Sequence, residues 1–140
     1  MMKKLLALLL ACVLVLALCA CGKAAPLSEE EKLAKVEELY LNKLSGNGGT
    51  LEEYRVDKVE PVDNETLSML TGKDGFYPDA TDDAVFAYVT YSVKPAADYY
   101  LAWTAGNGEE QGDWIVNKTA CVCVDKVNGE FALVSDGTGW

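Results

Sequence analysis

Ala84-Val-Phe-Ala-Tyr-Val-Thr-Tyr-Ser-Val-Lys94 is the stretch of this 140-residue chain that decides the fold. Its odd-numbered residues, from Val85 to Val93, are all apolar or aromatic, whereas the even-numbered ones are mostly hydroxyl-bearing. Alternation with a period of two is typical of a strand that lies in a sheet with one buried face. Pro95 follows and cannot donate a hydrogen bond to a neighbouring strand, so we expect the strand to end there.

A second apolar run, Trp114–Val127, is long enough to be a central strand of the same sheet. Asn128-Gly129 comes next, a pair that tolerates the positive φ angles of a tight hairpin turn, and Glu130–Ser135 is expected to return as the last strand. Gly106-Asn107-Gly108 is a similar turn signal, and it follows Tyr99–Thr104, which we predict to be a further strand. The pattern predicts an antiparallel meander.

A helix is predicted before the strands, over Ser28–Ser45. Ser28 and Glu31 have the spacing of a capping box, and Gly46 marks the end of the helix. Apolar side chains recur at steps of three and four residues between these limits, which indicates one buried stripe. The stripe consists of Leu33, Val36, Tyr40 and Leu44, with Leu41 beside it.

Two shorter elements are expected between this helix and the strand at 84–94. Residues 52–62 alternate irregularly between apolar and charged side chains, which indicates an edge strand that Pro61 ends or interrupts. Asn64–Leu70 reads as a short helix capped by Asn64 and stopped by Gly72. Residues 71–83 are predicted to be a loop.

Strands that follow one long helix, without β-α-β alternation, belong to the α+β class. We therefore expect an N-terminal amphipathic helix packed on a curved antiparallel sheet of four to five strands. The order of the helix at 28–45, the strand at 84–94 and the hairpin of 114–127 with 131–135 resembles cystatin-like and NTF2-like domains. That resemblance implies a helix lying in the hollow of the sheet.

The N-terminus has the features of a secretory signal. Lys3 and Lys4 precede an apolar run from Leu5 to Ala20, which is short for a membrane-spanning helix. Leu18-Cys19-Ala20-Cys21 resembles the lipobox of bacterial lipoproteins, which are cleaved before a cysteine that carries lipid. An ordinary secretory signal or an uncleaved anchor remain the alternatives.

The lipobox resemblance implies a domain organisation and an address. Residues 1–20 would be the signal peptide, 21–27 a lipidated tether beginning at Cys21, and 28–140 a single α+β domain. Two acyl chains on Cys21 would anchor the protein stably at the outer face of the cytoplasmic membrane, in the cell envelope. Trp114–Lys118, Gly129–Leu133 and Asp136–Gly139 also resemble segments of small lipoproteins from Gram-positive gut bacteria.

The charge balance excludes some classes of partner. The chain carries 12 basic and 22 acidic residues, and removal of residues 1–20 would leave a net charge of −12. Such a surface would not replace the counterions around nucleic-acid phosphates, so no nucleic acid is expected to bind. It also disfavours adhesion of the folded domain to an anionic bilayer, so the membrane is expected as a partner only through the lipid.

No motif of the chain points to catalysis, a cofactor or a metal. Histidine is absent, which removes the usual base of a triad or of a Cys–His pair. Asp74, Asp79, Asp82 and Asp83 offer oxygen ligands, but their spacing is not that of an EF-hand. Cys121 and Cys123 lie on one face of the predicted strand, and we expect them to be small core residues rather than a metal or redox pair.

Aromatic residues are the candidate ligand-binding group. A cleft between helix and sheet, apolar with a few polar groups, is the default site in a cone-shaped fold. The alternative is that these side chains fill the core. The candidate residues are Tyr99, Tyr100, Trp103 and Trp114.

The resulting hypothesis is a membrane-anchored lipoprotein with a non-catalytic module that binds a small ligand or another envelope protein. One alternative is an NTF2-like enzyme that uses a buried carboxylate and a tyrosine, which requires a carboxyl group of raised pKa in a pocket. The other is an inhibitor or immunity-like protein that acts through exposed loops. It requires an exposed aromatic patch at 71–83 or 105–112, whereas a filled interior would indicate a protein that acts through its surface.

Overall fold

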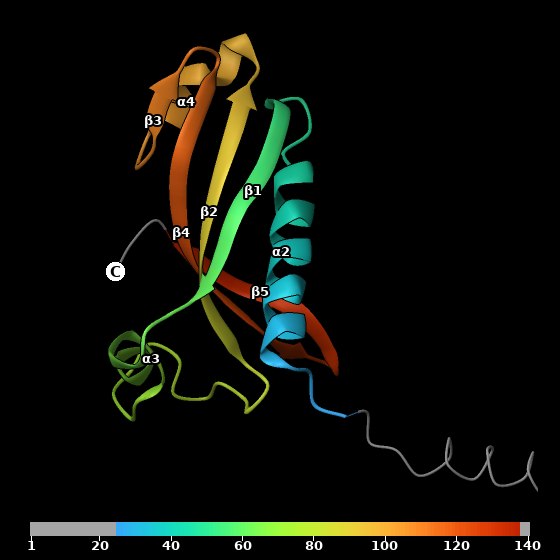
Figure 1. Ribbon diagram of the computed structural model, residues 1–140, viewed down its shortest axis with the longest axis vertical. Helices are drawn as coiled ribbons and strands as arrows, with labels where there is room; N and C mark the ends of the chain where they lie inside the picture. Colours follow the sequence, from blue (N-terminus) through green and yellow to red (C-terminus); the bar gives the residue numbers. More distant parts are fainter. Residues whose placement is uncertain (1–24, 138–140) are drawn as a thin grey trace, which may run out of the picture.

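The computed structural model describes residues 25–137, so the predicted signal peptide, Cys21 and most of the tether lie outside the described residues. The described chain forms a curved, open antiparallel sheet of five strands with helices on both of its faces (Figure 1). Its elements are α2 (Glu29–Ser45), β1 (Leu51–Pro61), α3 (Asn64–Thr71), β2 (Val85–Pro95), η1 (Ala97–Tyr99), α4 (Tyr100–Thr104), β3 (Glu109–Gln111), β4 (Trp114–Val127) and β5 (Glu130–Gly137).

The α+β class and the curved antiparallel sheet are therefore confirmed. The long helix does not stand at the N-terminus of the chain, because it begins at residue 29. The finer cystatin-like or NTF2-like assignment stays a prediction.

The sheet has the strand order β1-β2-β4-β3, and β5 also pairs with β4. β3 and β5 share one edge of the long strand β4. β3 pairs with Trp114–Val116, and β5 pairs with Cys121–Val127. Between them, the Asn107 side chain donates to the Thr119 carbonyl at 2.7 Å and accepts from the Thr119 N–H at 3.0 Å. The predicted hairpin of β4 and β5 is confirmed. The full meander is not, because β3 rather than 99–104 pairs with the start of β4, and β2 and β4 pair across the chain between them.

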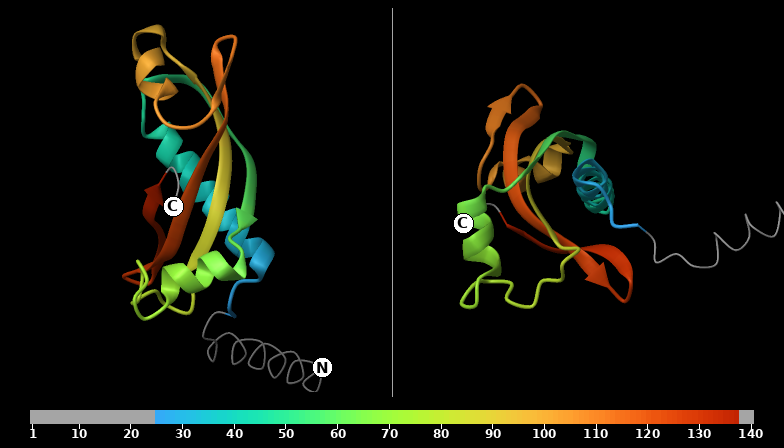
Figure 2. Two further views of the ribbon diagram at one scale, coloured as in Figure 1. Left: turned by 90° about the vertical axis from the view of Figure 1, so that its left-hand side faces the viewer. Right: turned by 60° about the horizontal axis from the view of Figure 1, so that its bottom comes forward.

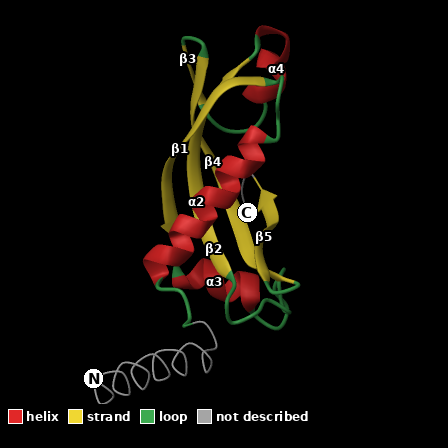
Figure 3. Ribbon diagram, turned by 90° about the vertical axis from the view of Figure 1, so that its right-hand side faces the viewer, coloured by secondary structure: helices red, strands yellow, loops and turns green. Residues whose placement is uncertain are grey.

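α2 begins with the predicted capping box. The Glu31 N–H donates to Ser28 Oγ at 3.2 Å, and the Ser28 N–H donates to Glu31 Oε2 at 2.7 Å. The helix lies across the inner face of the sheet (Figure 3), and its buried residues are Val36, Tyr40 and Leu44. The predicted apolar stripe is thus confirmed: these three residues are buried, and Leu33 packs partly buried against the same core.

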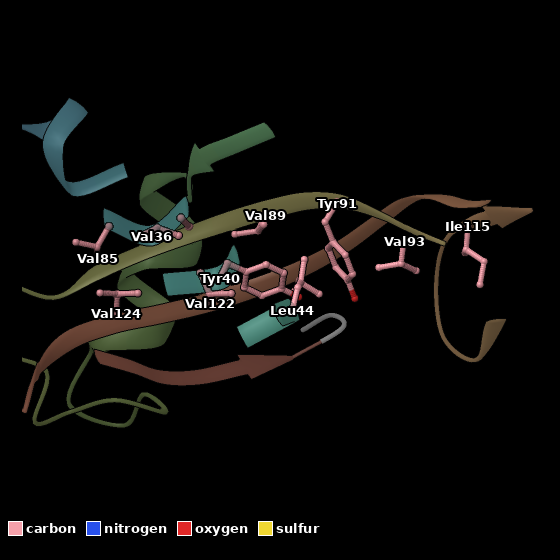
Figure 4. Packing of buried hydrophobic residues seen from close by; sticks show 12 residues of the cluster. Val36, Tyr40, Leu44, Val85, Val89, Tyr91, Val93, Ile115, Val122 and Val124 are labelled. Atoms are coloured by element: carbon pink, nitrogen blue, oxygen red, sulfur yellow. The ribbon is translucent and has the colours of Figure 1, made fainter. Parts of the chain in front are cut away.

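The main core fills the space between α2 and the sheet. The rings of Tyr40 and Tyr91 lie 5.1 Å apart between their centroids, and the inward-facing side chains of β2 and β4 surround them (Figure 4). The buried members of this cluster are Val36, Tyr40, Leu44, Val85, Ala87, Val89, Tyr91, Val93, Ile115, Ala120, Val122 and Val124.

A second, smaller core lies on the opposite face of the sheet. α3 and residues 72–84, which we call the outer cover, pack over one end of that face, so this end of the molecule has three layers (Figure 2). The fully buried residues of this core are Leu70, Phe86, Cys121 and Cys123. Both cysteines are buried, and their predicted place in the core is confirmed.

Two local predictions were wrong. Tyr99–Thr104 is not a strand, because the chain turns into η1 and α4 directly after Pro95, with the Tyr99 N–H bonded to the Ala96 carbonyl. Leu101 and Ala102 in this segment are good helix formers, which favours the helical turn. α3 is capped by Asp63 rather than Asn64, since Asp63 Oδ1 accepts from the Thr66 N–H at 2.8 Å.

Candidate functional site

The four aromatic residues predicted to bind a ligand lie at the end of the molecule formed by η1, α4 and β3, but they do not line one cavity. Tyr100 borders a hollow of about 480 Å³ together with Glu52, Lys94 and Asp113, and Tyr99, Trp103 and Trp114 are not among its lining residues. Trp103 is half-buried against the main core. The Trp114 ring stacks under Arg55, whose guanidinium carbon lies 4.7 Å from the ring centroid.

A buried lysine holds this end together. Lys118 is only 3% exposed, and its ammonium group donates to the carbonyls of Trp103, Ala105 and Asn107 at 3.0, 3.3 and 2.7 Å. Burial lowers the pKa of this lysine. Sequence reasoning missed the role of Lys118, although a single cation inside the apolar run of β4 was the available signal. Its contacts are structural, because they fix the chain that leads from α4 to β3.

A wide groove lies where the tether meets the domain, between α2 and the β4–β5 hairpin. Its volume is about 760 Å³, and Leu27, Leu39 and Phe131 are among its apolar lining residues. Most of the charged groups around it already pair within the protein, Lys35 with Glu38 and Lys126 with Asp83. Sites for small ligands use a few convergent polar groups to orient the ligand, and pairing leaves this groove with few.

The outer cover presents a contiguous apolar surface. Phe76 is 64% exposed, and Leu67 and Val134 are also exposed. Two hollows of about 240 Å³ each adjoin here: Phe76 and Val134 line the first, Leu67 lines the second, and both hollows share Tyr77, Pro78 and Ala80. We call Leu67, Phe76, Tyr77, Pro78 and Val134 the loop patch. Phe76, Tyr77 and Pro78 fall within the range 71–83, one of the two loops in which the inhibitor alternative requires an exposed aromatic patch, whereas Leu67 comes from α3 and Val134 from β5.

Polar bonds hold the loop that carries this patch. Asp125 accepts from the Thr81 N–H at 2.9 Å and from the Thr81 hydroxyl. The Tyr77 N–H donates to the Leu70 carbonyl at 2.8 Å, and the Tyr77 hydroxyl is hydrogen-bonded to the Ser135 hydroxyl. The loop is therefore fixed to the sheet at several points, and the shape of the patch is formed before any partner arrives.

Asp125 is the buried carboxylate of this region, with 9% exposure. Burial alone would raise its pKa, but hydrogen bonds from Thr81 and from the Lys126 N–H outweigh burial and lower the pKa. Asp125 is thus an ionised anchor for the loop rather than a proton donor. Its location under residue 81 was not visible in the sequence, although an acidic residue at the end of an apolar strand was a signal.

Other titratable groups of the described chain give little support to acid–base chemistry. The carboxyl groups of Glu31 and Asp63 also have lowered pKa values, because backbone N–H and side-chain groups donate to them. Burial raises the pKa of Tyr40 and Tyr91, and burial, Asp125 and Cys121 raise that of Cys123 to about 11. Within residues 25–137, no group of three or more Cys, Asp or Glu side chains is placed to hold a metal ion.

Comparisons with protein-family models, curated proteins and solved structures found no match to this chain. In the described part of the chain, no helix combines the length and the apolar character that crossing a bilayer requires.

Proposed function

We propose that this chain is a lipoprotein of the cell envelope, anchored through Cys21, whose domain recognises another protein through the loop patch without catalysis. The observation that carries the proposal is the contrast between a filled interior and an exposed Phe76 beside two hollows. Exposed aromatic residues next to pockets are typical centres of protein interfaces. Because the loop is already held in place, binding would cost little conformational entropy.

The charges around the loop patch indicate which surface charge its partner should carry. Asp74, Asp79 and Asp82 are exposed in the same loop, and Lys73 is its single basic residue. Complementary charge at the rim of an interface steers encounter and suppresses wrong partners. The partner is therefore a protein with an apolar recess that receives Phe76 and a basic rim around it.

Site-specific photocrosslinking in producing cells tests the patch. With p-benzoylphenylalanine in place of Phe76, we expect one discrete protein adduct. The matched control carries the same photoreactive residue at Leu101, which is 84% exposed at the opposite end of the molecule, and is expected to give no such adduct. Adduct formation at both positions, or at neither, would contradict recognition through the loop patch.

Labelling with palmitate tests the anchor separately. We expect the protein to incorporate label and Cys21→Ser to abolish incorporation, and globomycin to block removal of residues 1–20. A precursor that is processed normally in the presence of globomycin and carries no label would contradict lipidation at Cys21.

A small ligand in the tether groove is the second candidate, favoured by a volume of about 760 Å³, which lies within the range of small-molecule sites. Thermal shift with a library of envelope metabolites tests it. A ligand that stabilises the protein, and fails to stabilise Leu39→Glu, would favour this candidate over protein recognition.

A further inference from the structure

The tether and the loop patch lie at the same end of the molecule. Ala25, Pro26 and Leu27 line the groove at the start of α2, and Asp83, at the end of the loop that carries the patch, lines the same groove. The views of Figures 1 and 2 agree that α3 and the 72–84 loop lie at the end of the fold from which the tether leaves. α4 and β3 lie at the opposite end.

The tether is short compared with the domain. Three residues, 22–24, separate the proposed lipidated cysteine from Ala25, and the four residue-to-residue steps from 21 to 25 reach at most about 14 Å. The 17 residues of α2 run from this end toward α4, a length of about 25 Å. Because the tether is shorter than α2, it keeps the end of the domain that carries the loop patch close to the bilayer. The end formed by α4 can lie farther from the bilayer.

The patch is unsuited to contact lipid directly. Asp74, Asp79 and Asp82 are exposed beside it, and an anionic membrane surface repels such a group of carboxylates. An apolar recess with a basic rim, offered by a protein, fits both the exposed ring of Phe76 and these charges.

We propose that the loop patch docks onto a protein held in the same membrane as the lipid anchor. This rests on the proposed function, because it needs both the lipid on Cys21 and recognition through the patch. It adds that a short tether presents Phe76 near the bilayer, where the patch meets membrane-embedded partners at high effective concentration.

Cutting the tether after crosslinking tests where the partner resides. A protease site of equal length replaces residues 22–27 of the lipidated full chain, so that the tether is not lengthened, and p-benzoylphenylalanine replaces Phe76. After illumination of the cells and cleavage of the tether in washed membranes, we expect the adduct to stay with the membrane fraction while free domain is released. Release of the adduct with the free domain would overturn this inference and leave recognition through the patch intact. Absence of any adduct would instead contradict the proposed function.

Fluorescence in vesicles tests the orientation without a partner. Lipidated Phe76→Cys and Leu101→Cys are labelled with a donor, and the vesicles carry an acceptor on lipid headgroups. Cys121 and Cys123 are buried, so we expect them to react far more slowly than the cysteines placed at the exposed positions. We expect several-fold more energy transfer from position 76 than from 101, and loss of this difference when a long Gly/Ser spacer is inserted after Lys23. Equal transfer with the native tether, or collisional quenching of the position-76 probe by acyl-chain quenchers, would overturn the proposal.

Discussion

The two layers that cover the sheet are built on different principles. α2 lies on the inner face through a continuous stripe of buried apolar residues, including Tyr40 and Leu44, within the larger core. The outer cover buries Leu70 as the only fully buried residue of α3 and relies on polar bonds to Asp125 and Ser135. The comparison teaches that the layer carrying the loop patch is the one with less apolar burial behind it.

Local stability should follow this difference. Segments with few buried apolar contacts open at lower free energy than the core does. The outer cover is therefore expected to open without unfolding of α2. Cys121 and Cys123 lie beneath it and report such opening, because their thiols react only when the cover lifts.

The largest expected effect is in the inner layer. Leu44→Ala removes a side chain that is 2% exposed and should lower the free energy of unfolding by about 2–5 kcal/mol. Urea unfolding of the domain from residue 22 onward, followed by circular dichroism, measures the loss. Leu41→Ala, a half-buried neighbour on the same helix, is the matched control and should cost less. Equal losses would contradict the assignment of the core stripe.

A smaller and more local effect is expected in the outer cover. Asp125→Ala leaves the N–H groups of Thr81 and Lys126 without their acceptor, at a cost of about 1–3 kcal/mol. We expect the alkylation rate of the buried thiols to rise more than the global stability falls. Asp79→Ala, an exposed carboxylate in the same loop, should leave the rate unchanged. An unchanged rate in Asp125→Ala would mean that this carboxylate does not fasten the cover.

Acid should loosen the outer cover through the same carboxylate. The pKa of Asp125 is lowered on folding, so its contribution is present above the unfolded pKa of about 3.9 and is lost as pH falls through the folded value. The thermal midpoint is expected to fall as the pH is lowered below about 4, and to fall less in Asp125→Asn. If wild type and variant fall equally, other carboxyl groups such as Asp63 carry the acid sensitivity.

The smallest effect on stability belongs to the patch itself. Phe76→Ser changes an exposed side chain and should alter the free energy of unfolding by no more than about 0.5 kcal/mol. A photoreactive residue placed at Val134 in this variant should nevertheless crosslink to the partner less efficiently than it does beside the natural Phe76. Loss of stability comparable with Asp125→Ala would show that Phe76 supports the fold rather than a contact.

Much of the fold was predictable because local and long-range signals agree. Alternation predicted β2, the apolar run and the turn at Asn128 predicted the β4–β5 hairpin, and the capping box at Ser28 predicted the start of α2. α4 was missed because Tyr99–Thr104 is too short for periodicity to separate helix from strand.

The candidate site was less predictable, because it depends on contacts between distant segments. The aromatic residues at 99–103 were chosen for proximity in the sequence, yet only Tyr100 lines the hollow found there. The loop patch arises where Thr81 meets Asp125, 44 positions later in the chain, and no local pattern encodes that meeting. The sequence predicted only that an exposed aromatic residue could lie in one of two loops, of which 71–83 is one.

One edge of β4 is shared between β3 and β5, and the interval between them bears on pairing with other copies of the chain. An unpaired strand edge is a template on which neighbouring copies can add strands and polymerise. Asn107 occupies the interval between β3 and β5 with both ends of its carboxamide, so Thr119 presents no free backbone groups there. At this point of the β4 edge, a neighbouring copy therefore finds no backbone groups with which to pair.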